Sequence, residues 1–188
     1  MNRRTLLHNL LASIVAVPFL GSNEAKSIEA SPSSVRNRLR ISEALVEPED
    51  EELLIPLGQA ETKREGSDVT IISYAQTVPM ALAAAENLAE EKINAEVIDL
   101  RSIKPLDWPR VFQSVTKTHR VVIAEQDRPF CGIGAEIAYR IQREIFDALD
   151  APIMRVAQED VPMPYNERLE KAVLPNTEKI IAAVEKIC

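Results

Sequence analysis

The stretch VTIISYAQTVPMALAAAENLAEEKINAEVIDL, residues 69–100, carries two apolar runs on either side of an apolar helical face. The runs at residues 69–74 and 95–100 are short, rich in Val and Ile and bounded by turn residues, which predicts buried strands. Helical spacing within residues 80–92 gathers apolar side chains on one face: Met80, Ala81, Ala84, Ala85 and Leu88. The stretch therefore predicts a strand, a helix and a second strand, the unit from which parallel sheets are built.

The same alternation continues toward the end of the chain. Further strands and helices are expected at residues 108–118, 120–125, 135–149, 152–157 and 177–187. Asp107 precedes the first of these helices as a candidate N-cap. Strands that are almost continuously apolar are buried on both faces. The predicted fold class is α/β, a three-layer sandwich with a mostly parallel sheet of about five strands.

The chain divides into three predicted parts. Residues 68–188 form the α/β domain. Residues 46–67 form a linker, because an acidic cluster is followed there by a polar turn that ends at Gly66. Residues 1–45 form a leader or transit-like segment, and regular structure is expected only after Glu65.

The predicted leader has features of a targeting segment. Arg3 and Arg4 precede a mostly apolar run at residues 6–20, and no acidic residue occurs before Glu24. The run is too short and too interrupted for a membrane span. A secretory or twin-arginine signal, an organelle transit peptide and a segment joined to a truncated gene remain open. The Ser-rich, acid-poor continuation to Arg40 slightly favours the transit peptide.

The composition is that of a globular domain with an acidic body. Of 188 residues, 46% are hydrophobic and 27% charged, and the net charge is -7. Residues 1–45 hold six basic and three acidic side chains, so residues 46–188 carry about -10. An acidic body argues against nucleic acid as a partner. Cys131 and Cys188 lie far apart without paired histidines nearby, which indicates neither a zinc site nor a disulfide framework and favours a reducing compartment.

The loops that follow parallel strands gather at one edge of the sheet, where ligands bind. The loops expected at this edge are residues 75–79, 101–106, 126–134 and 158–165. Gly132 and Gly134 stand before a helix, as phosphate-binding glycines do. Ile137 occupies the position of the third glycine of a dinucleotide fingerprint, so a tight turn that permits close packing is favoured.

Two carboxylates lie near this turn. Glu125 ends a predicted strand and is either a catalytic acid or the partner of a loop arginine such as Arg128. Glu136 lies at the start of a predicted helix, where a negative charge stabilises the positive end of the helix dipole. The helix-stabilising role is favoured for Glu136.

Nucleophiles and bases do not combine into a recognisable catalytic set. The histidines are His8, in the predicted leader, and His119, which is expected at the surface or in a turn. Cys131 is a candidate reactive thiol, with packing favoured, and Cys188 is expected to be exposed at the chain end. The sequence therefore assigns no catalytic, cofactor-binding or metal-binding residue.

Four segments resemble the C-terminal domain of pyruvate dehydrogenase beta subunits, members of the transketolase-like superfamily. The segment DLRSIKPLDW (residues 99–108) indicates the superfamily. The beta subunit is indicated by IPLGQAETKREGSDVTI (55–71), AEQDRPFCGIGAEI (124–137) and LDAPIMRVAQEDVPMPY (149–165). The last of these, with its DVPMPY motif, is the most discriminating. The resemblance covers residues 46–188.

The resemblance implies a role within a larger enzyme. The family reaction is oxidative decarboxylation of pyruvate with transfer of the acetyl group to a lipoyl arm. Thiamine diphosphate and magnesium bind between an alpha subunit and the N-terminal domain of the beta subunit, so no cofactor is expected on this chain alone. The family's C-terminal domain pairs beta subunits and docks the basic subunit-binding domain of dihydrolipoyl acetyltransferase. By resemblance, the docking contacts fall on Asp150 and on the terminal carboxylate of Cys188; for Asp150 the role of an exposed turn acid before Pro152 remains open.

Several alternatives remain open from the sequence. The chain is part of the dehydrogenase or, in a different class, a noncatalytic truncated interaction module. A beta subunit of a branched-chain 2-oxoacid or acetoin dehydrogenase is a further alternative, with a weaker fit over residues 132–136 and 160–165. The expected location is the mitochondrial matrix or another organelle if residues 1–45 are a transit peptide, and otherwise the bacterial cytoplasm. Neither nucleic acid nor a membrane is expected as a partner.

Overall fold

The computed structural model describes residues 55–188, which contain a five-stranded sheet in the order β1-β3-β2-β4-β5. The strands are β1 (Glu61–Arg64), β2 (Val69–Ser73), β3 (Ala95–Asp99), β4 (Val121–Ala124) and β5 (Met154–Val156). The helices are α2 (Thr77–Glu90), α3 (Trp108–Thr118), α4 (Ile133–Ile145), α5 (Glu167–Val173) and α6 (Thr177–Glu185), with a short 3-10 helix η1 (Phe146–Ala148). Strands β2 to β5 are mutually parallel, and β1 pairs antiparallel with β3.

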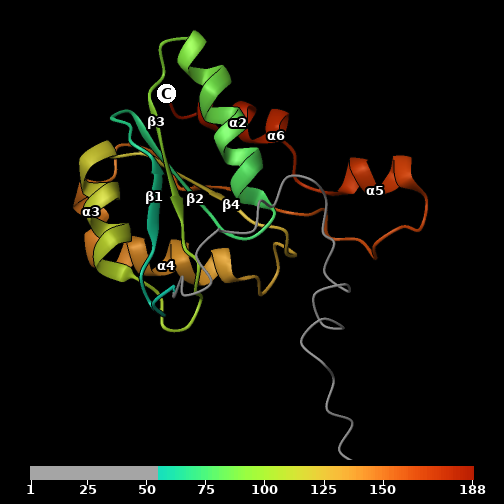
Figure 1. The fold of residues 1–188 in the computed structure, drawn as a ribbon, viewed down its shortest axis with the longest axis horizontal. Helices are drawn as coiled ribbons and strands as arrows, with labels where there is room; N and C mark the ends of the chain where they lie inside the picture. Colours follow the sequence, from blue (N-terminus) through green and yellow to red (C-terminus); the bar gives the residue numbers. More distant parts are fainter. Residues whose placement is uncertain (1–54) are drawn as a thin grey trace, which may run out of the picture. The chain divides into compact units, whose positions relative to one another are not determined.

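Helices cover both faces of the sheet, as Figure 1 shows. Helices α2 and α6 pack together on one face, whereas α3 and α4 lie on the other. This arrangement follows from the strand order, since β3 lies on one side of β2 and β4 on the other, and right-handed crossovers place their helices on opposite faces. The predicted α/β three-layer sandwich with a mostly parallel sheet is confirmed.

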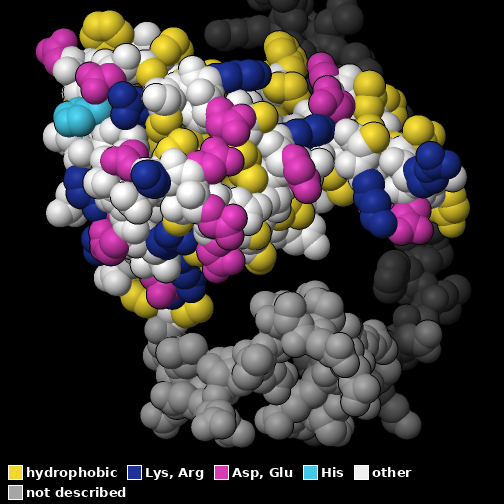
Figure 2. All heavy atoms as spheres, turned by 90° about the horizontal axis from the view of Figure 1, so that it is seen from above, with side chains coloured by type: hydrophobic (Ala, Val, Ile, Leu, Met, Phe, Trp, Pro, Cys, Tyr) yellow, Lys and Arg dark blue, Asp and Glu magenta, His cyan; other side chains and the backbone are white. Residues whose placement is uncertain are grey.

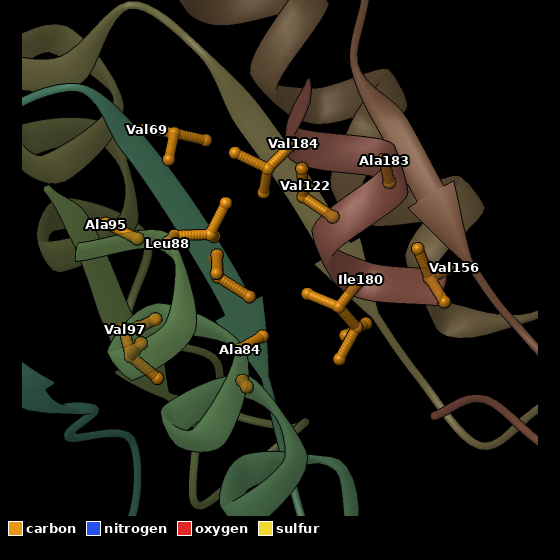
Figure 3. Packing of buried hydrophobic residues seen from close by; sticks show 14 residues of the cluster. Val69, Ala84, Leu88, Ala95, Val97, Val122, Val156, Ile180, Ala183 and Val184 are labelled. Carbon is orange, nitrogen blue, oxygen red and sulfur yellow. The ribbon is translucent and has the colours of Figure 1, made fainter. Parts of the chain in front are cut away.

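The core consists of two apolar layers separated by the sheet. Strand β2 supplies Ile71 to one layer and Ile72 to the other, because successive side chains point to opposite faces. Between α2 and α6, Leu88 is fully buried, and Figure 3 shows its side chain directed toward Val184. Packing against this layer fixes α6, the last helix of the chain.

A buried polar network holds α3 against the opposite face. The Thr70 hydroxyl lies 2.7 Å from the Ser114 hydroxyl and 2.7 Å from the Thr118 hydroxyl. The nearly buried carboxylate of Glu96 accepts hydrogen bonds from Ser114 and from the Lys117 ammonium. These contacts satisfy polar groups that would be costly to bury without partners.

Two elements were not predicted from the sequence. Strand β1 lies within the predicted linker, so the expectation that regular structure begins only after Glu65 is wrong. Its sequence, Glu-Thr-Lys-Arg, has no apolar alternation, and it is a strand because its backbone pairs with β3. Helix α5 has seven residues and buries no side chain, and its three apolar residues, Leu169, Ala172 and Val173, are too few to indicate a helix from the sequence.

The predicted leader, residues 1–45, lies outside the described residues, as does the first part of the predicted linker. Among the helices formed by residues 55–188, none combines the length and apolar character needed to cross a membrane.

Candidate functional site

The carboxyl edge of the sheet contains a buried ion pair. Glu125, directly after β4, is fully buried, and its Oε1 atom accepts hydrogen bonds from both Nε and Nη2 of Arg155 on β5, the Nε contact being 3.2 Å. Arg155 Nη1 also donates to the carbonyl oxygen of Pro129 at 3.0 Å. Glu125 therefore forms a salt bridge with an arginine, as one of its two predicted roles required. The partner is Arg155, and the prediction of Arg128 is wrong. The pair ties two neighbouring strands to the loop between β4 and α4.

The Glu125 carboxylate also explains why glycine is needed at position 134. Oε2 accepts a hydrogen bond of 2.6 Å from the Gly134 amide in the first turn of α4. A Cβ atom at Gly134 would collide with this carboxylate, at 2.7 Å from its carbon, and would lie 2.9 Å from Arg155 Nε. A Cβ atom at Gly132 would collide with the carbonyl oxygen of Arg128. Both glycines are therefore required for close packing, as the sequence favoured.

The same geometry does not fit thiamine diphosphate. A phosphate group at the start of α4 would need the Gly134 amide, which already donates to the Glu125 carboxylate. A phosphate there would also be repelled by the buried negative charge of Glu125. The described residues also contain no group of three or more His, Cys, Asp or Glu side chains placed to hold a metal ion. The turn is a structural element of this domain, fixed by its own carboxylate.

Tyr74 lies near the ion pair, at the end of β2. Burial raises the pKa of its phenol to about 12, and the negative charges of Glu125 and Asp127 act in the same direction. The phenol is therefore neutral at physiological pH. It adds polar character to this edge without adding charge.

The other candidate residues lie in structural positions. His119 caps the end of α3 in a left-handed conformation, with φ of 61°, and its Nδ1 atom is 2.8 Å from the carbonyl oxygen of Ala148, which confirms the predicted turn position. Glu136 lies in the first turn of α4, as predicted. Cys131 is exposed, so the packing role favoured from the sequence is wrong. Its φ of 60° places it in a tight turn just before the helix.

The two predicted docking residues both lie at the opposite, amino edge of the sheet. The Asp150 amide donates to the carbonyl oxygen of His119 at 2.9 Å. Cys188, the last residue, is exposed, while its thiol is partly covered: burial raises the pKa of the thiol, and Arg120 and Asp68 are the nearby charges. Asp150 and Cys188 therefore flank the residues that lead into β4.

A hollow of about 450 Å³ adjoins Asp150. Its lining is mostly apolar and comes from α4, η1 and the segment before β5: Ala138, Gln142, Phe146, Leu149, Asp150, Ala151, Pro152 and Ile153. Phe146 is exposed at this hollow. The amino edge thus offers an acidic group beside an apolar depression.

Comparison with known families identifies the domain. The transketolase C-terminal domain family matches residues 58–180, which is more than half of the chain. The chain belongs to this family. The match includes the whole sheet and extends into α6.

Similar proteins are pyruvate dehydrogenase E1 component beta subunits. The chain is 50% identical to that of Rickettsia felis over 134 residues, covering 71% of this chain and 41% of the relative. It is 37% identical to that of Rhizobium meliloti over 180 residues, covering 93% and 39%, and 48% identical to the mitochondrial beta-1 subunit of Arabidopsis thaliana over 139 residues, covering 74% and 38%. The chain therefore spans about two fifths of the length of these relatives. The resemblance to the C-terminal domain of pyruvate dehydrogenase beta subunits is confirmed.

A solved structure has the same fold. The chain described as "Split gene transketolase, inactive beta4 tetramer" aligns with a TM-score of 0.64 at 30% sequence identity. The alignment covers 73% of this chain and 44% of that one.

Proposed function

We propose that this chain supplies the C-terminal domain of the beta subunit of a thiamine diphosphate-dependent pyruvate dehydrogenase. In this role it pairs with a second beta subunit and an alpha subunit, and it docks the assembly to the acetyltransferase core. The observation that carries the proposal is the 37–50% identity to named beta subunits across the folded domain. The branched-chain and acetoin alternatives are less favoured, because the quoted relatives are all named for pyruvate dehydrogenase.

The amino edge is the docking surface of this proposal. Asp150 and Cys188 flank the start of β4, and an apolar hollow adjoins Asp150. A basic docking domain would find opposite charge at the rim and apolar contact within the hollow. Charge complementarity of this kind accelerates encounter and fixes the orientation of the two partners.

Replacing Asp150 with Ala is expected to weaken binding of the acetyltransferase subunit-binding domain by about tenfold, since one partner of an interfacial ion pair is lost. The salt dependence of the affinity should also become shallower. Titration calorimetry at two ionic strengths measures both effects.

Asp160→Ala is the matched control for this titration. It removes the same charge from an exposed position in the loop that follows β5, at the opposite edge of the sheet. Its affinity should stay within about twofold of the unchanged chain. Equal affinity and equal salt dependence of the Asp150→Ala variant and the unchanged chain would remove Asp150 from the docking surface.

The catalytic contribution is a separate part of the proposal. The cofactor supplies the decarboxylation chemistry in the assembled enzyme, and the glycine turn before α4 does not fit it. We therefore expect no pyruvate-dependent release of carbon dioxide from this chain alone. Turnover measured after the chain is purified together with an alpha subunit would contradict the alternative of a noncatalytic interaction module. An assembly that docks to the core without turnover would favour that alternative.

The proposed location follows the relatives. The Arabidopsis and Caenorhabditis elegans proteins are named as mitochondrial, and the Rickettsia and Rhizobium proteins are bacterial. For this chain we propose the mitochondrial matrix if residues 1–45 act as a transit peptide, and the bacterial cytoplasm otherwise.

A further inference from the structure

The junction between α3 and β4 holds the turn that carries Asp150. The Asp150 amide donates a hydrogen bond to the carbonyl oxygen of His119 at 2.9 Å. The Nδ1 atom of the His119 ring lies 2.8 Å from the carbonyl oxygen of Ala148. The turn 148–150 is thus held at two points by one residue. These two contacts form the His119 clasp.

The position of the proton on the His119 ring follows from its partner. A carbonyl oxygen can only accept a hydrogen bond, so the neutral ring must carry its proton on Nδ1 and leave Nε2 without one. The His119 side chain is exposed, and Figure 2 shows it in cyan at the surface of the domain. The clasp therefore fixes the tautomer of a histidine that water can reach.

The backbone of His119 and its ring hold the turn in different ways. His119 ends α3 in the left-handed region, with φ of 61°, where glycine is the most favourable residue and asparagine the next. Either residue would preserve the carbonyl oxygen that accepts from Asp150. Glycine would lack a donor for the carbonyl oxygen of Ala148, whereas the amide nitrogen of asparagine is attached to Cγ, as Nδ1 is in histidine. The ring contact can therefore be removed or replaced while the backbone contact is kept.

The carboxylate of Asp150 is left available to a partner. Asp150 is exposed, and it takes part in none of the ion pairs found within residues 55–188. On the same turn, Leu149 packs against the core and also lines the apolar hollow. The clasp thus fixes the acidic group beside the hollow through the backbone and leaves its charge unpaired.

We propose that His119 is a positioning residue for docking, because its clasp holds Asp150 where the basic subunit-binding domain of the acetyltransferase meets it. The inference rests on the proposed function. It goes beyond that function by assigning a second residue to docking, one that acts through Asp150 and needs no contact with the partner. A turn that is fixed before binding loses less conformational entropy when the partner binds.

His119→Gly is expected to weaken binding of the acetyltransferase subunit-binding domain by about fivefold, because the turn loses one of its two contacts while the left-handed backbone is kept. His119→Asn should bind within about twofold of the unchanged chain, because its amide replaces the Nδ1 donor. Titration calorimetry on the full chain measures both affinities under the conditions used for Asp150→Ala. Urea unfolding first establishes that the variants are folded.

A double-mutant cycle distinguishes positioning of Asp150 from a general structural role. If the clasp acts through Asp150, then His119→Gly should change the affinity of the Asp150→Ala variant by less than about twofold. A merely structural role would weaken binding equally with and without Asp150. Nitrogen NMR of the His119 ring, assigned by comparison with His119→Asn, should show the proton on Nδ1 at about pH 8.5, where an imidazole is neutral.

Three results would overturn the inference and leave the proposed function standing. The first is a His119→Gly variant that binds as tightly as the unchanged chain while Asp150→Ala binds more weakly. The second is an equal loss from His119→Gly with and without Asp150, or a His119→Asn variant that binds as weakly as His119→Gly. The third is a His119 ring that carries its proton on Nε2. If Asp150→Ala itself leaves the affinity unchanged, the docking surface and this inference fail together.

Discussion

Arg155→Met is expected to destabilise the domain by about 3 kcal/mol. The substitution leaves the Glu125 carboxylate fully buried without its cationic partner, and removing one member of a buried pair typically costs about 3–5 kcal/mol. We expect a loss at the lower end of this range, because the Arg155 side chain is 22% exposed and water can partly replace it. Urea unfolding followed by circular dichroism gives the free energy of unfolding.

Arg143→Met is the matched control for this substitution. Arg143 pairs with Glu144 on the surface of α4, where both side chains are well exposed. An exposed pair contributes less than about 1 kcal/mol, so the control should change stability little. Adding Glu125→Gln to the Arg155→Met variant should recover part of the loss, because the buried charge is then gone. Similar losses from the two single arginine substitutions would show that burial of Glu125 does not govern the effect.

Leu88→Ala is expected to destabilise the domain by about 3 kcal/mol as well. Leu88 is fully buried between α2, the sheet and α6, and its truncation removes apolar contacts and leaves a cavity. Leu169→Ala, the same change at the exposed surface of α5, should cost less than about 0.5 kcal/mol. The two variants are compared by the same urea titration. A loss at Leu169 as large as at Leu88 would mean that α5 packs against the domain, contrary to its exposure.

The parallel core was predictable because its signal is local. The strand expected at residues 69–74 is observed at Val69–Ser73, and the helix expected at 108–118 begins and ends where predicted. The Asp107 side chain caps that helix by accepting from the Arg110 amide, as its position indicated. Apolar runs and caps are read from neighbouring residues, so they need no knowledge of the fold.

The contacts of the candidate sites were not predictable in the same way. Glu125 and Arg155 are 30 residues apart and meet only because β4 and β5 are adjacent in the sheet. The sequence indicates Arg128 as the partner of Glu125, because Arg128 lies in the loop that follows Glu125. The requirement for glycine at position 134 likewise depends on where the Glu125 side chain lies. Asp150 lies near the start of β4 because of the turn between η1 and β5, and Cys188 lies there because of the return path of α6.

The two outermost strands, β1 and β5, determine how this domain can associate. Strand β5 has three residues, and β1 has four, with charged side chains at Glu61, Lys63 and Arg64 and an irregular register against β3. Edge strands that are short, charged and irregular pair poorly with a strand from another molecule. Partners must therefore bind through side chains rather than by extending the sheet. The same feature disfavours the stacking of strands from different molecules that leads to fibrous aggregates.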